Sequence, residues 1–228
     1  MSTFALIHGA WGSGWHWAGV PDALRALGHE VVAPDLPCED PAATFEDYAQ
    51  VVIDAIADTS GDDVVVVGYS LGGLTAPLVA ARRPVRALVY LAALLPDPGV
   101  PFARDPARLV LPDYLAGTTR PDAEGVTRWI DFGVYRRVAC HDCPEPVTRE
   151  RFDRSRGQAT GPYGIPCPLA AQPDVPTRYV VCTEDRLVDP AAARHAARDR
   201  LGVEPEELPG SHSPMASRPH ELARVLAG

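Results

Sequence analysis

The stretch Val64–Gly72, which reads VVVVGYSLG, decides the fold of this chain. Four consecutive valines are typical of a strand that is buried on both faces of a parallel sheet. The next five residues match the pattern G-x-S-x-G, with Ser70 at the centre. This pattern requires small residues around the serine, because the turn from strand to helix is tight and its backbone is strained. Since a helical segment, Leu71–Arg82, follows at once, we expect Ser70 to be a nucleophile at a helix N-terminus rather than an incidental serine.

Strand-like and helix-like segments alternate on both sides of this stretch. We expect strands at Thr3–His8, Glu30–Ala33, Val64–Val67, Val85–Ala92, Arg178–Cys182 and Glu204–Leu208. Helical spacing is present at His16–Leu27, Thr44–Ala57, Leu71–Arg82, Pro190–Leu201 and about Pro214–Leu226. Such alternation predicts an α/β fold with a mostly parallel six-stranded sheet and helices on both of its faces.

The alternation stops between residues 96 and 176, where proline, arginine and aromatic residues are frequent. We therefore predict a core made of residues 1–95 and 177–228. Residues 96–176 are predicted to be a cap, inserted after the fourth strand and lying at one edge of the sheet. A chain of 228 residues is long enough for one such domain with one insertion.

Composition excludes several classes of function. The net charge of −9 and the pI of about 5.2, with no basic stripe, disfavour nucleic-acid binding. No apolar run is long enough to cross a membrane, and the N-terminus does not resemble a signal peptide. Five cysteines without a secreted framework favour a cytoplasmic protein with reduced thiols. The chain has 21 arginines and no lysine, so reactions that need a lysine side chain are excluded.

A serine nucleophile needs a histidine base and an acid that orients it, in the chain order serine, acid, histidine. We choose His212 as the base because it lies in a loop between the last strand and the last helix. For the acid we prefer Asp185, which follows the strand before. Asp189 is well explained as an N-cap before a proline, whereas Glu184 stays open as an alternative.

The oxyanion of an acyl-transfer reaction needs two backbone N–H donors. We predict that they belong to Leu71, the residue after the nucleophile, and to Ala10, in the loop after the first strand. The glycines of that loop also suggest a dinucleotide fold. They miss the G-x-G-x-x-G spacing, because Trp17 stands at the last position, so a nucleotide site is disfavoured. The ester hydrolysis that we expect requires no cofactor.

The inserted segment contains aromatic residues and one close pair of cysteines. We predict that Trp129, Phe132 and Tyr163 line a substrate pocket, although they could equally form the core of the cap. Cys140–Cys143 has C-x-x-C spacing but no second pair, so a structural role is preferred to a metal site.

Taken together, these motifs are similar to one branch of a known superfamily. They are His8–Trp11 with Trp15–Trp17, Gly28–Val31 with Asp35–Pro37, Gly68–Gly73, Val89–Ala93 and Ser211–Pro214. The chain resembles the methylesterase and hydroxynitrile-lyase branch of the α/β-hydrolase superfamily, and within it bacterial salicylate-esterase-like members. The resemblance implies a triad of Ser70, Asp185 and His212. The lyases carry a lysine directly after the catalytic histidine, where this chain has Ser213, so a lyase is disfavoured.

The expected function is therefore a serine hydrolase that cleaves a small aryl or methyl carboxylic ester through an acyl-enzyme. An alternative on the same scaffold is a secondary-metabolism enzyme for C–C cleavage, lactone formation or cyclisation. A third, less favoured hypothesis is a receptor-like protein that binds a ligand without turnover. The partner is expected to be a small molecule, not a nucleic acid or a membrane, and the protein a monomer or homodimer.

Overall fold

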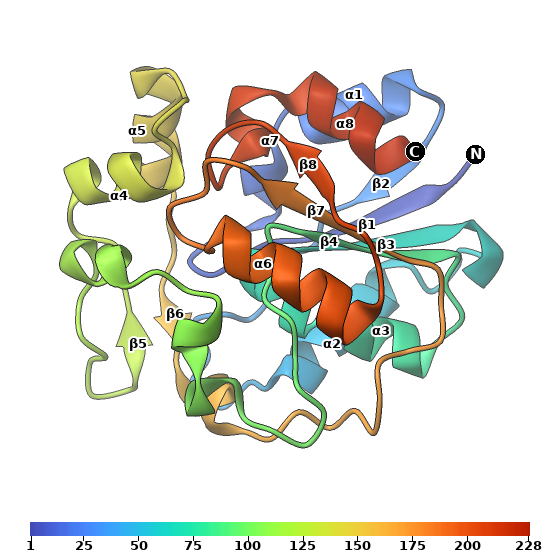
Figure 1. Cartoon of the computed structure of the whole chain (residues 1–228), viewed down its shortest axis with the longest axis horizontal. Helices are drawn as coiled ribbons and strands as arrows, with labels where there is room; N and C mark the ends of the chain where they lie inside the picture. The colour runs from blue at the N-terminus through green and yellow to red at the C-terminus, as the bar shows by residue number, and fades with distance from the viewer.

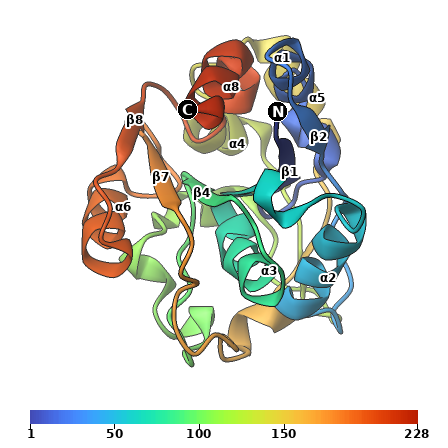
Figure 2. The ribbon, with the colours of Figure 1, turned by 90° about the vertical axis from the view of Figure 1, so that its right-hand side faces the viewer.

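The fold is built on one six-stranded sheet that lies between helices (Figures 1 and 2). The computed structural model describes residues 1–228 apart from the side chain of Ala107. The strands are β1 (Thr3–Ile7), β2 (Glu30–Val32), β3 (Val64–Tyr69), β4 (Ala87–Leu91), β7 (Thr177–Cys182) and β8 (Glu206–Leu208). Their order is β2-β1-β3-β4-β7-β8, and every neighbouring pair is parallel. The predicted α/β fold and its six-stranded sheet are confirmed.

The valines of β3 explain why this strand lies in the middle of the sheet. Val64 and Val66 pack into one hydrophobic cluster, and Val65 and Val67 pack into another. Successive side chains of a strand point to opposite faces. A run of four apolar residues therefore fills both faces, and each of the four is less than 9% exposed.

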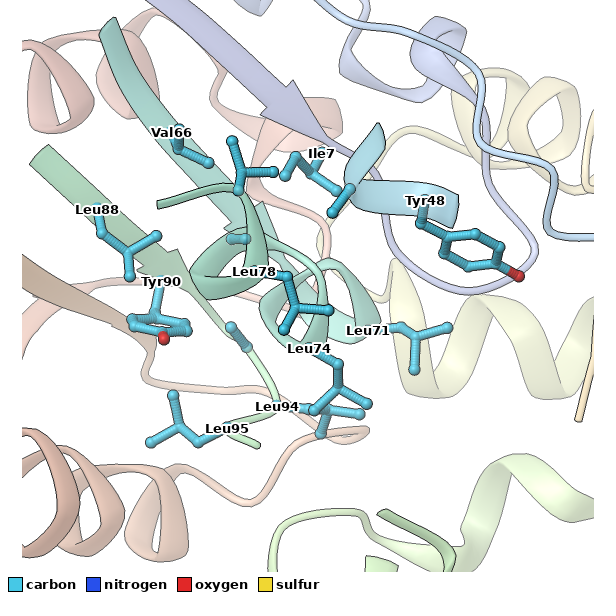
Figure 3. Close-up of a cluster of buried hydrophobic side chains, with 14 of the residues drawn as sticks. Ile7, Tyr48, Val66, Leu71, Leu74, Leu78, Leu88, Tyr90, Leu94 and Leu95 are labelled. Carbon is cyan, nitrogen blue, oxygen red and sulfur yellow. The ribbon is translucent and has the colours of Figure 1, made fainter. Parts of the chain in front are cut away.

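Helices cover both faces of the sheet, as the view in Figure 2 shows. One face carries α1 (Val20–Ala26), α7 (Pro214–Ser217) and α8 (Pro219–Ala227). The other carries α2 (Phe45–Ala55), α3 (Ala76–Arg82) and α6 (Pro190–Ala196). Figure 3 shows part of the second of these layers, in which Leu78 lies between the strand residues Leu88 and Tyr90 on one side and Tyr48 on the other.

Three predicted helices differ from the expectation: two begin as 3-10 turns, and one is divided in two. The helix after β3 begins as a 3-10 turn, Ser70–Leu74, before α3. The segment His16–Leu27 begins as a 3-10 turn, Gly14–Trp17, and α1 starts only after Gly19, whose φ is +86°. The last helix is two helices, because Pro219 begins α8, and proline suits the first turn of a helix but not its interior.

The inserted segment has more regular structure than its sequence pattern indicated. It contains α4 (Phe132–Ala139), α5 (Glu145–Asp153) and an antiparallel pair, β5 (Val126–Thr127) with β6 (Gln158–Ala159). Its proline-rich parts form 3-10 turns at Phe102–Arg104, Pro106–Arg108, Pro112–Gly117 and Gly161–Gly164. In Figure 1 these elements lie at the edge of the sheet where the strands end. Trp11, after β1, and Leu187, after β7, pack into a small cluster with them.

In the described part of the chain, no helix has both the length and the apolar character needed to cross a membrane.

Candidate active site

Ser70 stands at a sharp turn between β3 and the helix that follows. Its φ is +52°, a conformation that residues other than glycine rarely adopt. The two flanking glycines permit this turn. A Cβ on Gly68 would lie 2.8 Å from the carbonyl oxygen of Gly72, and a Cβ on Gly72 would lie 2.7 Å from that of Ile7. The sequence pattern around Ser70 is thus required by close backbone packing, and it leaves the serine at the head of the helix.

His212 lies between Ser70 and Asp185 and forms a hydrogen bond with each. Its Nε2 is 2.9 Å from Ser70 Oγ, and its Nδ1 is 2.6 Å from Asp185 Oδ2. His212 and Asp185 are only 4% and 5% exposed, so the hydrogen bond between them is shielded from water. The three residues chosen from the sequence are therefore together in space, with the geometry that general-base activation of a hydroxyl requires.

The structure also distinguishes Asp185 from Glu184 and Asp189, the two acids near it in the sequence, by their contacts and exposure. Asp185 Oδ1 accepts from the backbone N–H groups of Leu187 and Val188, at 2.8 and 2.9 Å, which fixes the plane of the carboxylate. Asp189 instead accepts from Ala191 N at the start of α6, as expected of an N-cap. Glu184 is exposed.

Ala10 and Leu71, the predicted oxyanion donors, line the same cavity as Ser70. Leu71 is in the first turn of its helix, where backbone N–H groups have no partner within the helix. Within the described chain, the N–H of Ala10 donates to no protein acceptor. Both N–H groups thus remain available to a developing oxyanion.

His8 holds the Ala10 loop, a role that sequence reasoning missed. Its Nε2 accepts from Leu36 N at 3.0 Å, so its Nδ1 carries the proton and donates to the carbonyl oxygen of Gly9 at 2.9 Å. Burial lowers the pKa of His8 to about 4, which keeps the ring neutral. The signal in the sequence was its position directly after β1, beside the glycine loop.

A cavity of about 600 Å³ opens above Ser70 and is lined by both the core and the inserted segment. Trp129 and Tyr163 line it, in the positions expected of pocket residues. Phe132 does not, and this expectation needs correction. Its ring packs edge-on against Phe152, with 5.7 Å between centroids, and the guanidinium of Arg149 lies 3.4 Å from the centre of the same ring. These contacts on α4 and α5 hold Phe132 outside the cavity.

The Cys140–Cys143 segment contacts the loops that carry Asp185 and His212. His141 Nε2 donates to the carbonyl oxygen of Glu184 at 3.0 Å. Asp142 Oδ2 accepts from Ser211 N at 3.2 Å and from Arg218 at 3.3 Å. Burial raises the pKa of Asp142, but these hydrogen bonds outweigh it and lower the pKa. The segment therefore ties the inserted part of the chain to the loops before Asp185 and His212.

The two cysteines of this segment are buried free thiols in the cluster around α4. In the described residues, no group of three His, Cys, Asp or Glu side chains is placed to hold a metal ion.

The chain is similar to known proteins over nearly its whole length. A family model described as the alpha/beta hydrolase family matches residues 4–225. Pyrethroid hydrolase from Sphingobium wenxiniae is 30% identical over 248 residues, which cover 100% of this chain and 87% of that protein. Methylesterase 7 from Arabidopsis thaliana is 28% identical over 258 residues, covering 98% of this chain and 94% of that one. Among solved structures, a pyrethroid hydrolase from Sphingobium faniae JZ-2 has a TM-score of 0.80 at 28% identity, over 99% of this chain and 96% of that chain.

Proposed function

This chain belongs to the alpha/beta hydrolase family, and from that premise we propose that it is a carboxylesterase-like serine hydrolase with Ser70 as nucleophile, His212 as base and Asp185 as the orienting acid. The observation that carries the proposal is the chain of two hydrogen bonds, 2.9 and 2.6 Å long, that joins these side chains under one cavity. A strained serine backbone at the head of a helix supports it further.

In the first half of the reaction, Ser70 Oγ attacks the ester carbonyl carbon while His212 Nε2 takes the hydroxyl proton. Asp185 accepts from Nδ1–H, which keeps the tautomer that leaves Nε2 free to act as a base and stabilises the imidazolium that forms. The carbonyl oxygen becomes negative and is stabilised by the N–H groups of Ala10 and Leu71. His212 then gives its proton to the leaving alkoxide, so that the alcohol departs and an acyl-enzyme remains.

In the second half, water attacks the acyl-enzyme with His212 as base, and the same two N–H groups stabilise the second oxyanion. The acid is released and Ser70 regains its proton. Every proton moves between Ser70, His212, substrate and water, so the proposed chemistry needs no cofactor.

The substrate we propose is a small aryl or methyl ester. A cavity of about 600 Å³ is suited to a ligand of that size. The relatives support the same class, because they are named a pyrethroid hydrolase and a methylesterase. We propose that residues 96–176 act as the cap that sets specificity, since Trp129 and Tyr163 come from them. Five free thiols favour a cytoplasmic location.

The test is intact-protein mass spectrometry after treatment with a fluorophosphonate probe. We expect one adduct, mapped to Ser70, and no adduct on the Ser70→Ala variant. The same variant should lose about 10⁴-fold or more in turnover of methyl and aryl esters. Near wild-type turnover by Ser70→Ala would exclude Ser70 as the nucleophile.

A further inference from the structure

Arg151 is a buried cation in the wall of the active-site cavity. It lies on α5, is 3% exposed, and lines the same cavity as Ser70 and His212. One of its N–H groups donates to the carbonyl oxygen of His16 at 2.7 Å, and its Nε is buried without a partner. A guanidinium has five N–H donors and stays charged. The phenol of Tyr135 is also within hydrogen-bonding reach of it, but the Nε–H donor has no acceptor among the described residues.

The described part of the protein gives Arg151 no carboxylate. None of the ion pairs among these residues includes it. The ionisable groups around it are Tyr135, Cys140, Tyr69 and Cys143. Burial raises the pKa of both tyrosines, so their phenols stay neutral. A buried charge without a counter-charge is strongly unfavourable.

Cys140 is the neighbour that comes closest to supplying a negative charge. The hydrogen bond from Cys143 and the charge of Arg151 lower the pKa of the Cys140 thiol. However, no hydrogen bond between Arg151 and Cys140 occurs among the described side chains, whereas the planar guanidinium is suited to two parallel bonds with a carboxylate.

The rest of the cavity wall near the cap is largely apolar, with Leu94, Trp129 and Val188 among its residues. A charge in such surroundings interacts strongly with an opposite charge. The other cation of the wall, Arg120, is exposed and therefore hydrated. The buried cation of the cavity wall is thus Arg151.

We infer that Arg151 binds a free carboxylate of the substrate, so that the enzyme prefers carboxylic esters carrying a second, ionised carboxylate to their neutral counterparts. The inference rests on the proposed function, because it assigns the substrate class of that same site. The bound carboxylate supplies a counter-charge that no carboxylate of the described residues supplies, and the ester carbonyl is then held over Ser70.

Rigid substrate pairs test this directly. The monomethyl esters of terephthalic and isophthalic acid carry a carboxylate that cannot reach its own ester group, and the matching carbamoyl methyl esters have nearly the same shape without charge. For wild type we expect kcat/KM to be at least about tenfold higher for the carboxylate member of one pair. The released acid is measured by chromatography.

Substitutions of single arginines show which residue is responsible for the preference for the carboxylate ester. Arg151→Met should remove this preference, so that its kcat/KM for the carboxylate ester falls to about its kcat/KM for the carbamoyl ester. Arg149→Met, which loses the same charge from an exposed position on α5, should retain it. If Arg151→Met fails to fold, competitive inhibition of the wild-type enzyme tests the inference instead. Terephthalate should inhibit at a concentration at least about tenfold lower than terephthalamide does.

Each outcome is decisive. Wild type without a preference for the carboxylate ester overturns the inference and leaves Cys140 as the counter-charge. A preference that persists in Arg151→Met, or that disappears in Arg120→Met, also overturns it. If wild type hydrolyses neither ester and Ser70 takes no fluorophosphonate, the proposed function itself has failed. Turnover of the carbamoyl ester without a carboxylate preference refutes only the role of Arg151.

Discussion

The backbone N–H of Ser211 donates a hydrogen bond of 3.2 Å to the carboxylate of Asp142, although the two residues are 69 positions apart in the sequence. Ser211 directly precedes the proposed base, and Asp142 lies between α4 and α5 of the inserted segment. Arg218, at the start of α8, contacts the same carboxylate at 3.3 Å. The position of His212 therefore depends on a residue that belongs to the predicted cap.

Removal of this contact should affect the rate more than substrate binding. We expect Asp142→Ala to lower kcat on the order of 10- to 100-fold, with KM changed less than threefold, because a small displacement of the base misaligns it with Ser70. Asp142→Asn keeps an acceptor for Ser211 N and should retain most activity. Steady-state kinetics and the rate of fluorophosphonate labelling measure both. The exposed Asp153→Ala on α5 is the control, and an equal loss in that variant would contradict the prediction.

Asp185 and Asp189 offer a matched pair of substitutions four residues apart. Asp185→Asn should lower kcat by about 10⁴-fold, because the amide no longer holds the tautomer of His212 that acts as a base. Asp189→Asn should leave kcat almost unchanged, since asparagine caps a helix as well as aspartate does. Kinetics on one methyl ester compare the two, and similar losses in both variants would refute the assignment of the acid.

Gly72 should tolerate no larger residue. A Cβ there would lie 2.7 and 2.8 Å from the carbonyl oxygens of Ile7 and His8, so Gly72→Ala must displace β1 or the helix. We expect the free energy of unfolding to fall by about 1–3 kcal/mol, and esterase activity to fall with it. Gly164→Ala, with no atom within 4 Å of the added Cβ, is the control and should stay within about 0.5 kcal/mol. Urea unfolding of both variants is the measurement.

The buried His8 and His16 should make the fold sensitive to acid. Burial lowers their pKa values to about 4 and about 3, below the unfolded value of 6.5. At a pH between the folded and the unfolded pKa, the unfolded chain therefore binds more protons than the folded protein does. The contribution of the two neutral, buried imidazoles to the free energy of unfolding is therefore complete above about pH 6.5. It is lost as the pH falls through the folded pKa values. His8 alone should contribute a loss on the order of 3 kcal/mol between pH 7 and pH 4.

Urea unfolding across this pH range measures that loss. His8→Gln should reduce its steepness, although the variant is less stable at pH 7. His195→Gln, at an exposed position, should follow the wild-type curve. A wild-type free energy of unfolding that stays constant from pH 7 to pH 4 would contradict the prediction.

The sequence by itself determined the six strands, the turn at Ser70 and the choice of His212. The signals used were local: strand periodicity, a run of four valines and the spacing of two glycines. They predict local structure because backbone geometry depends on neighbouring residues. The same signals placed the start of α6 at Asp189 through its cap. They did not reveal α4 and α5, where short amphipathic stretches are interrupted by prolines and turns.

Only the tertiary structure decided which side chains face the cavity. It turned Phe132 away toward Phe152 and Arg149, and it brought Arg151 to the wall beside Ser70. It also brought Asp185, rather than Glu184, to His212. Such choices depend on contacts between segments that are distant along the chain, such as Ser70 and His212, which are 142 positions apart. No local pattern encodes them, because the energy of a buried contact belongs to the pair and arises only once the sheet has brought both loops to the same edge.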